Sequence, residues 1–194
     1  SEQLFRTTLE IQRSTLGLEE KETLGTMTAL GANMYSQGRY NEAEDFFRQA
    51  VDALKRTLPE DHPSTLTAGH NLGSVLLVQG RHQLAVDVLA EVLEGRRKIY
   101  GQDHNWVGFT ANALASSFFN LGKYKEAEPI YEEALLILRN ELAESHYAVL
   151  TIRLNLAHIY RLTERFDQAE SDFLMILNEH GQDNQHGINS TLGL

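Results

Sequence analysis

The sequence contains no cysteine, no long apolar run and no cluster of basic residues. The absence of cysteine excludes disulfide bonds and thiolate metal sites, and it favours a reducing compartment, so we expect a cytoplasmic protein. No apolar run approaches the roughly 18 residues that a membrane span needs, and we expect no membrane association. The formal net charge is −10 and no Lys/Arg cluster offsets it locally, so we expect no nucleic-acid partner.

What the sequence does contain is a repeat with a fixed period. Gly38, Gly80 and Gly122 are each 42 residues apart and lie in near-copies of one phrase. The copies read QGRYNEAEDFF, QGRHQLAVDVL, LGKYKEAEPIY and, one period later, TERFDQAESDF. A period of this size is typical of a solenoid, in which each unit buries its apolar face only against its neighbours.

The repeat places the same kind of residue in the same column. One column holds alanine, one leucine and one a bulky residue: Ala43, Ala85, Ala127 and Ala169; Leu30, Leu72, Leu114 and Leu156; Phe47, Leu89, Tyr131 and Phe173. Apolar residues at i, i+3, i+4 and i+7 predict one helix before each turn glycine and one after it. In the links between hairpins, Asp or Ser before a helix is expected to cap it, Pro63 suits the first helical position, and Gly101 is expected to end a helix.

The columns predict one solenoid over residues 1–194, with full repeats at 20–58, 62–100, 104–142 and 146–180. Residues 2–16 match only the second helix of a repeat, and residues 181–194 match the start of a further one. We therefore expect a fragment of a longer solenoid with apolar, uncapped end faces.

Three positions depart from the pattern. Glu164 replaces the turn glycine, which costs roughly 1–2 kcal/mol if that position has left-handed backbone geometry. Asp172 replaces the apolar residues of its column, so we expect looser packing in the fourth repeat. Gly108 stands where Leu24, Leu66 and Leu150 stand in the other repeats.

These columns, the small-residue phrases NLG at 71–73, ALA at 113–115 and NLA at 155–157, and the glycine turn resemble the tetratricopeptide repeat. The 42-residue period and the phrases DHPSTL and KYKEAEPIYEEAL resemble its longer variant, typified by kinesin light chain. The resemblance covers roughly residues 24 to 177. It implies an all-α, right-handed superhelix of about four helical hairpins, with a concave groove that binds a peptide segment of a partner protein.

The resemblance also implies which residues line that groove. They are Thr28, Tyr35, His70, Ser74, Leu77, Asn112, Ser116, Phe119, Asn120, Leu154, His158 and Arg161. The small residues Ala32, Ser74 and Ser116 leave room for a guest, and asparagine offers donors and acceptors to a peptide backbone. Only Asn112 matches the asparagine column of kinesin light chain and only one cation is present, so the acidic cargo of that family is not expected here.

The sequence contains no recognisable catalytic or metal-binding motif. There is no GxSxG, no phosphate-cradling glycine loop, no HExxH and no cysteine nucleophile. His62, His104 and His146 share a column, but equivalent positions in successive repeats lie roughly 10 Å apart, too far to share a metal ion. We therefore expect no enzyme, no metal and no cofactor, and we assign these histidines a capping or packing role.

The sequence predicts a protein-interaction module and leaves two alternatives open. The repeats are also typical of regulatory or sensor arms of larger signalling proteins that carry an NTPase-switch or peptidase domain. Exposed end helices would alternatively allow self-association between copies of the chain.

Overall fold

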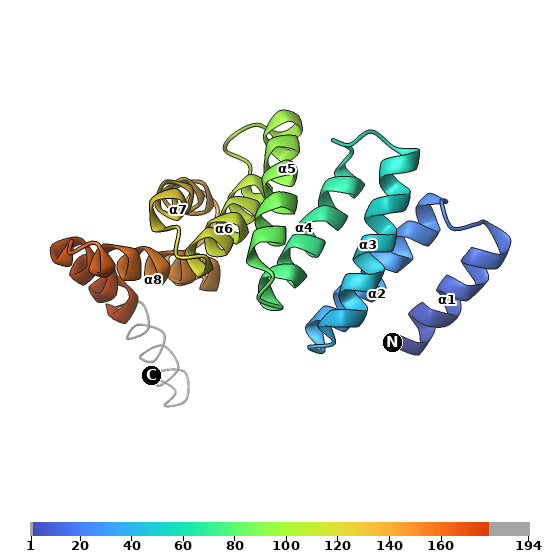
Figure 1. The fold of residues 1–194 in the computed structure, drawn as a ribbon, viewed down its shortest axis with the longest axis horizontal. Helices are drawn as coiled ribbons and strands as arrows, with labels where there is room; N and C mark the ends of the chain where they lie inside the picture. Colours follow the sequence, from blue (N-terminus) through green and yellow to red (C-terminus); the bar gives the residue numbers. More distant parts are fainter. Residues whose placement is uncertain (1, 179–194) are drawn as a thin grey trace, which may run out of the picture. The chain divides into compact units, whose positions relative to one another are not determined.

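The computed structural model describes residues 2–178, and the predicted repeat start at 181–194 lies outside them. The chain divides into two compact units, residues 1–102 and 103–194. The first contains α1 (Glu2–Thr15), α2 (Lys21–Ser36), α3 (Tyr40–Thr57), α4 (Pro63–Val78) and α5 (His82–Tyr100). The second contains α6 (Asn105–Asn120), α7 (Tyr124–Leu138) and α8 (Tyr147–Leu162), followed by a helical stretch over 166–178. Figure 1 follows these helices from blue to red.

Helices pack against their neighbours in chain order. In the first unit α1 packs on α2, α2 on α3, α3 on α4 and α4 on α5, and α2 also contacts α4. In the second unit α6 packs on α7, α7 on α8, and α6 contacts α8. We call α2, α4, α6 and α8 the A helices, and α3, α5, α7 and the stretch 166–178 the B helices. The described residues form no strand, so the predicted all-α solenoid fold is confirmed.

The predicted columns form the core. The alanine and leucine columns are buried throughout: Ala43, Ala85, Ala127 and Ala169; Leu30, Leu72, Leu114 and Leu156. Small residues let the two helices of a hairpin approach closely, because a Cβ added at Gly73 would lie 2.5 Å from Cγ of Leu89. Gly108 is explained in the same way, since Leu138 fills the space that a side chain there would occupy.

The turns between A and B helices have the left-handed geometry that the glycines predict. Gly38, Gly80 and Gly122 have φ of 74°, 77° and 72°. Glu164 adopts φ 61° at the equivalent position and is the one described non-glycine residue with positive φ. The strain expected from the sequence is therefore present in the fourth hairpin.

Three A helices begin with a histidine cap. The Nδ1 atoms of His62, His104 and His146 accept hydrogen bonds from the backbone N–H of the residue two positions later, over 3.2, 3.1 and 3.2 Å. The capping role predicted for these histidines is confirmed, whereas the expectation that Asp or Ser provides the cap is wrong. Histidine takes this role because its extended backbone aims the ring nitrogen at a first-turn amide that has no helical partner. Pro63 follows at the first helical position and Gly101 ends α5, both as predicted.

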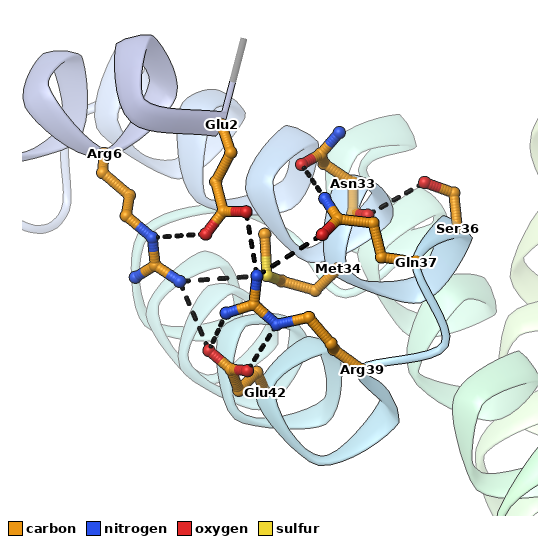
Figure 2. A network of polar contacts seen from close by, with 8 residues as sticks. All are labelled: Glu2, Arg6, Asn33, Met34, Ser36, Gln37, Arg39 and Glu42. Carbon is orange, nitrogen blue, oxygen red and sulfur yellow. Dashed lines mark hydrogen bonds and ion pairs between the residues drawn. The ribbon is translucent and has the colours of Figure 1, made fainter.

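Polar side chains join successive repeats at a regular spacing. Figure 2 shows Arg39, which donates two hydrogen bonds of 2.6 Å to Glu42 and one of 2.8 Å to Glu2 on α1. Arg6 completes the cluster by donating to both carboxylates. We call a side-chain contact between residues 36 to 38 apart a rung. Further rungs are Arg13–Gln49, Lys55–Glu91, Arg56–Glu19, Arg81–Glu44, Lys98–Asp61 and Gln79–Asn41 in the first unit, and Asn105–Glu141 and Arg165–Glu128 in the second.

Asp172 has a partner that the column pattern does not suggest. Arg153, only 5% exposed, donates to Asp172 over 2.8 Å and to Glu144 over 2.9 Å. Arg153 itself occupies the column of Met27, so two departures from the pattern compensate each other. The fourth hairpin is therefore held by a buried ion pair at the place where we expected loose packing.

Within residues 2–178, no helix is both long and apolar enough to cross a membrane. The same residues contain no group of three or more histidine, cysteine or acidic side chains that could hold a metal ion.

Candidate peptide-binding groove

Three of the A helices, α2, α4 and α6, contain fewer charged residues than the B helices α3, α5 and α7. α4 and α6 contain no Asp, Glu, Lys or Arg at all. In α2 the charged residues are confined to the first turn, at Lys21 and Glu22. Each of these helices buries its leucine column and leaves the predicted groove residues half-buried or exposed. α2, α4 and α6 therefore offer partly accessible faces with little formal charge, whereas α8 carries Arg153 and Arg161.

A pocket of about 220 Å³ opens on this surface in the first unit. Six residues line it, from α2, α3 and α4: Ala32, Tyr35, Phe47, His70, Asn71 and Ser74. Three of the predicted groove residues, Tyr35, His70 and Ser74, are thereby brought together around one cavity. The Tyr35 ring is fixed by an edge contact with Tyr40, with ring centroids 5.5 Å apart, and Phe47 is buried beneath. Two rigid aromatic rings with polar groups beside them suit the capture of a side chain.

The histidine in this pocket carries no charge at neutral pH. Burial of the imidazole lowers the pKa of His70 to about 3, and the nearby positive charge of Arg96 adds to the effect. Burial also lowers the pKa of Arg96, to about 10, so this guanidinium stays protonated at neutral pH. The residues that line the pocket are therefore neutral, and the positive charge of Arg96 is near enough to act on His70.

The remaining predicted residues of the first unit lie apart from this pocket. Thr28 lines another cavity, of about 310 Å³, with Lys21, Leu24 and the start of α4. The hydroxyl of Thr28 donates to the carbonyl of Leu24 within its own helix. Leu77 is half-buried one turn after Ser74 on α4.

In the second unit, Ser116 takes part in a buried hydrogen-bond network. The Tyr131 hydroxyl donates to Oγ of Ser116 over 2.9 Å and accepts from Nδ2 of Asn155 over 2.9 Å. Tyr131 has no exposed surface, and burial raises its pKa to about 12. This network joins α6, α7 and α8 and leaves Ser116 committed to a contact within the chain.

Phe119 and the two asparagines of α6 are placed differently from one another. Phe119 packs edge-on against Tyr124 and Tyr131, with centroids 5.4 and 6.5 Å apart, so it supports the hairpin. Asn120 is exposed and donates to the carbonyl of Ser116. Asn112 keeps a buried Oδ1 that accepts no hydrogen bond from the described part of the chain.

The three predicted residues of α8 are partly or fully accessible. Leu154 is 41% exposed, Arg161 is exposed, and His158 packs edge-on against Phe173 with centroids 6.0 Å apart. Among the predicted residues, Arg161 is the one that carries a formal charge at neutral pH regardless of its surroundings.

The sequence reading did not identify Asn71 and Phe47 as pocket residues. Phe47 belongs to a column that the pattern assigns to the core, and Asn71 belongs to the small-residue phrase NLG at 71–73. The signal was available, because Asn71 and Asn155 stand at the same repeat position two repeats apart. Their different surroundings could be recognised only once the helices were placed.

Comparison with known proteins identifies the repeat. A family model described as tetratricopeptide repeat matches residues 64–135 and 108–178, and a second model of the same description matches residues 23–64. No curated protein sequence matches the chain.

Several solved structures share the fold. A putative kinesin light chain from Podosopora anserina with nearly identical TPR-like repeats is 24% identical, with a TM-score of 0.75 over 94% of this chain and 86% of that one. BtubC (BKLC) from P. vanneervenii is 20% identical, with a TM-score of 0.82 over 94% and 73%. A Rap protein complexed with competence and sporulation factor is 16% identical, with a TM-score of 0.72 over 93% and 48%. At these identities the likeness establishes the fold.

Proposed function

Because the chain belongs to the tetratricopeptide repeat family, we propose that it is a non-enzymatic adaptor whose A-helix faces bind a peptide segment of a partner protein. The observation that carries the proposal is the pocket between α2 and α4. It is lined by residues that the family groove implies, and the helix behind it has no formal charge. A Rap protein of the same fold is complexed with a factor, which supports the use of such repeats for capture.

The proposed mechanism is presentation of a preformed surface. The walls of the pocket are fixed by core packing, since Phe47 is buried and Tyr35 is held against Tyr40. A partner segment loses conformational freedom on docking while the scaffold loses little, so a small number of contacts suffices for binding. Exposed asparagine side chains such as Asn120 add hydrogen bonds to an extended backbone.

A matched pair of substitutions tests the proposal. Ala32 on α2 and Ala90 on α5 are both exposed helical alanines, one on the proposed surface and one on a B helix. Peptides are first selected from a random display library on the unmodified chain. Ala32→Arg is then expected to weaken their binding by about tenfold or more, because the long cationic side chain covers the pocket, whereas Ala90→Arg leaves binding unchanged.

The proposal fails in either of two cases. If the library yields no peptide that the folded chain retains, the surface is not a peptide site. If selected peptides bind Ala32→Arg and Asn120→Arg as well as the unmodified chain, they bind elsewhere. Circular dichroism and thermal unfolding of each variant establish that it is folded.

Self-association is a second candidate, and exposed apolar side chains favour it. Leu4 and Ile11 on α1 are 72% and 57% exposed, and Leu177 in the final helical stretch is 66% exposed. Such residues are suited to pair with another copy of the chain. A mass that stays monomeric by light scattering at all concentrations would exclude this.

A further inference from the structure

The pocket between α2 and α4 lies in the first unit at the same repeat positions that form the buried hydrogen-bond network of the second unit. Phe47, Ala32 and Asn71 stand at the repeat positions of Tyr131, Ser116 and Asn155, each two repeats earlier. In the second unit these positions form a hydrogen-bonded chain from Asn155 through the tyrosine hydroxyl to Ser116. In the first unit two of the three polar atoms of that chain are absent, because phenylalanine replaces tyrosine and alanine replaces serine.

The third member, Asn71, is retained without the contact that it makes in the other unit. Nδ2 of Asn155 donates to the Tyr131 hydroxyl over 2.9 Å. The equivalent amide of Asn71 lines the pocket and makes no side-chain hydrogen bond with any residue of the described chain. The first unit thus has an amide donor beside a cavity, where the second unit has the equivalent donor bonded to the Tyr131 hydroxyl.

The cavity is large enough for a guest and selective in its chemistry. Its volume of about 220 Å³ exceeds the roughly 30 Å³ that one water molecule occupies in the liquid several-fold, so part of a side chain fits. No charged side chain lines it, and the rings of Tyr35 and Phe47 supply apolar walls. Transfer of an ionised group into such surroundings is unfavourable unless a partner of opposite charge is present.

We propose that this pocket receives a neutral, oxygen-bearing side chain of the bound segment, a serine or threonine hydroxyl or an asparagine or glutamine carbonyl. Nδ2 of Asn71 donates to that oxygen, which takes the place of the Tyr131 hydroxyl. This specificity rests on the proposed peptide-binding function and adds to it the chemistry of the anchoring residue.

Other anchors fit less well. A purely apolar side chain would cover the Asn71 amide, exclude water from it and leave its donor unsatisfied, which is unfavourable. A cationic side chain would meet the positive charge of Arg96, which is close enough to His70 to depress its pKa. A carboxylate would lose its hydration for one neutral donor on the pocket wall.

Threonine and valine are isosteric, so a pair of peptides separates the hydrogen bond from shape. For the peptides selected from the library, the residue that enters the pocket is found by an alanine scan and then made threonine, valine or glutamate. The unmodified chain is expected to bind the threonine peptide about tenfold more tightly than the valine and glutamate peptides. Asn71→Leu is expected to remove the preference for threonine over valine. Asn155→Leu is the matched control and keeps it, because that amide is already bonded to Tyr131.

A second variant rebuilds the internal network. Phe47→Tyr combined with Ala32→Ser supplies the hydroxyls of the second unit, so the new tyrosine hydroxyl accepts from Asn71 and occupies the place of the guest oxygen. Peptide binding is expected to fall by about tenfold while thermal stability is retained or raised, a combination that a merely destabilising change would not produce.

The outcomes distinguish this inference from the function on which it rests. If peptides are selected and lost with Ala32→Arg, but bind with no threonine preference and bind the rebuilt pocket equally well, only the anchor chemistry is wrong. If the selected anchor is acidic, basic or aliphatic, the same conclusion follows. If no peptide is selected, the function and the anchor chemistry fail together.

Discussion

Four histidines of this chain show how the surroundings of a residue decide its role. His62, His104 and His146 accept backbone hydrogen bonds at helix starts, where a ring nitrogen with a free lone pair is needed. His70 lies in the interior of a helix instead, where burial keeps it neutral. The capping column was predictable from its position before each A helix, whereas the state of His70 depends on neighbours from other helices.

A residue-scale prediction concerns the one turn that lacks glycine. Glu164→Gly is expected to raise the free energy of unfolding by about 1 kcal/mol, because glycine adopts φ near 61° without the steric cost that a Cβ imposes. Urea denaturation followed by circular dichroism measures the change.

The reverse substitution is the control. Gly80→Glu is expected to destabilise by a similar amount, and the cause is the backbone alone, since no neighbouring atom lies within 4 Å of a Cβ built there. Equal stability of Glu164→Gly and the unmodified chain would show that the left-handed turn is not strained.

At the scale of elements, the columns predicted the hairpins but not the ion pair that closes the last one. Asp172 and Arg153 lie 19 residues apart, in different columns and different helices. Each residue differs from the apolar or small residues that fill its own column in the other repeats. Only the packing of the final helical stretch on α8 shows that they neutralise each other.

At this scale we predict that substituting one member of the ion pair destabilises the fold more than substituting both members. Asp172→Ala is expected to destabilise by about 3 kcal/mol, because it leaves the guanidinium of Arg153 buried with Glu144 as its remaining carboxylate. Replacing both members, by Arg153→Met and Asp172→Val, is expected to recover most of that loss, since these residue types occupy the columns in other repeats.

Denaturant midpoints of the single and double variants test the pair. A double variant as unstable as Asp172→Ala would mean that the ion pair itself, rather than the avoidance of a lone charge, holds the hairpin. An Asp172→Ala variant as stable as the unmodified chain would contradict the packing described here.

At the scale of the molecule, titration of the shifted groups gives the chain a two-stage response to acid. The pKa of His70 is lowered from 6.5 to about 3, so its contribution to stability is complete above pH 6.5 and is lost as the pH falls toward 3. Hydrogen bonds from arginine lower the pKa of Glu2 and Glu42 below 4.5. Burial alone would raise the pKa of Glu44, but hydrogen bonds from Arg48, Gln79 and Arg81 outweigh it and lower the pKa. These carboxylates stabilise the fold above pH 4.5 and cease to do so below it.

We therefore predict that urea stability declines as the pH falls from 6.5 toward 3, and that the decline becomes steeper below pH 4.5, where loss of the carboxylate contributions adds to that of His70. His70→Gln is expected to reduce the slope between pH 6.5 and 3 by up to about 1.4 kcal/mol per pH unit, and to leave only the carboxylate contribution below pH 4.5. Identical slopes for His70→Gln and the unmodified chain between pH 6.5 and 5 would contradict the burial of a neutral histidine.

The whole-chain period was the strongest prediction from the sequence, because a fixed spacing constrains every helix at once. It predicted the all-α fold, the turn glycines and the buried columns. The resemblance to the family, rather than the period, assigned Tyr35, His70 and Ser74 to one face. The period could not predict the pocket, which depends on how side chains from α2, α3 and α4 meet. Nor could it show that Ser116 is committed to Tyr131, because that contact depends on side-chain geometry between three helices.

The rungs also restrict how such a chain can change its length. One residue inserted within a helix rotates everything after it by about 100°, which would move rung partners and core columns away from each other together. Gain or loss of a complete 42-residue unit preserves every spacing. Length changes that keep the fold are therefore duplications or deletions of whole hairpins. Related proteins are expected to differ in length by entire repeats and not by scattered small insertions.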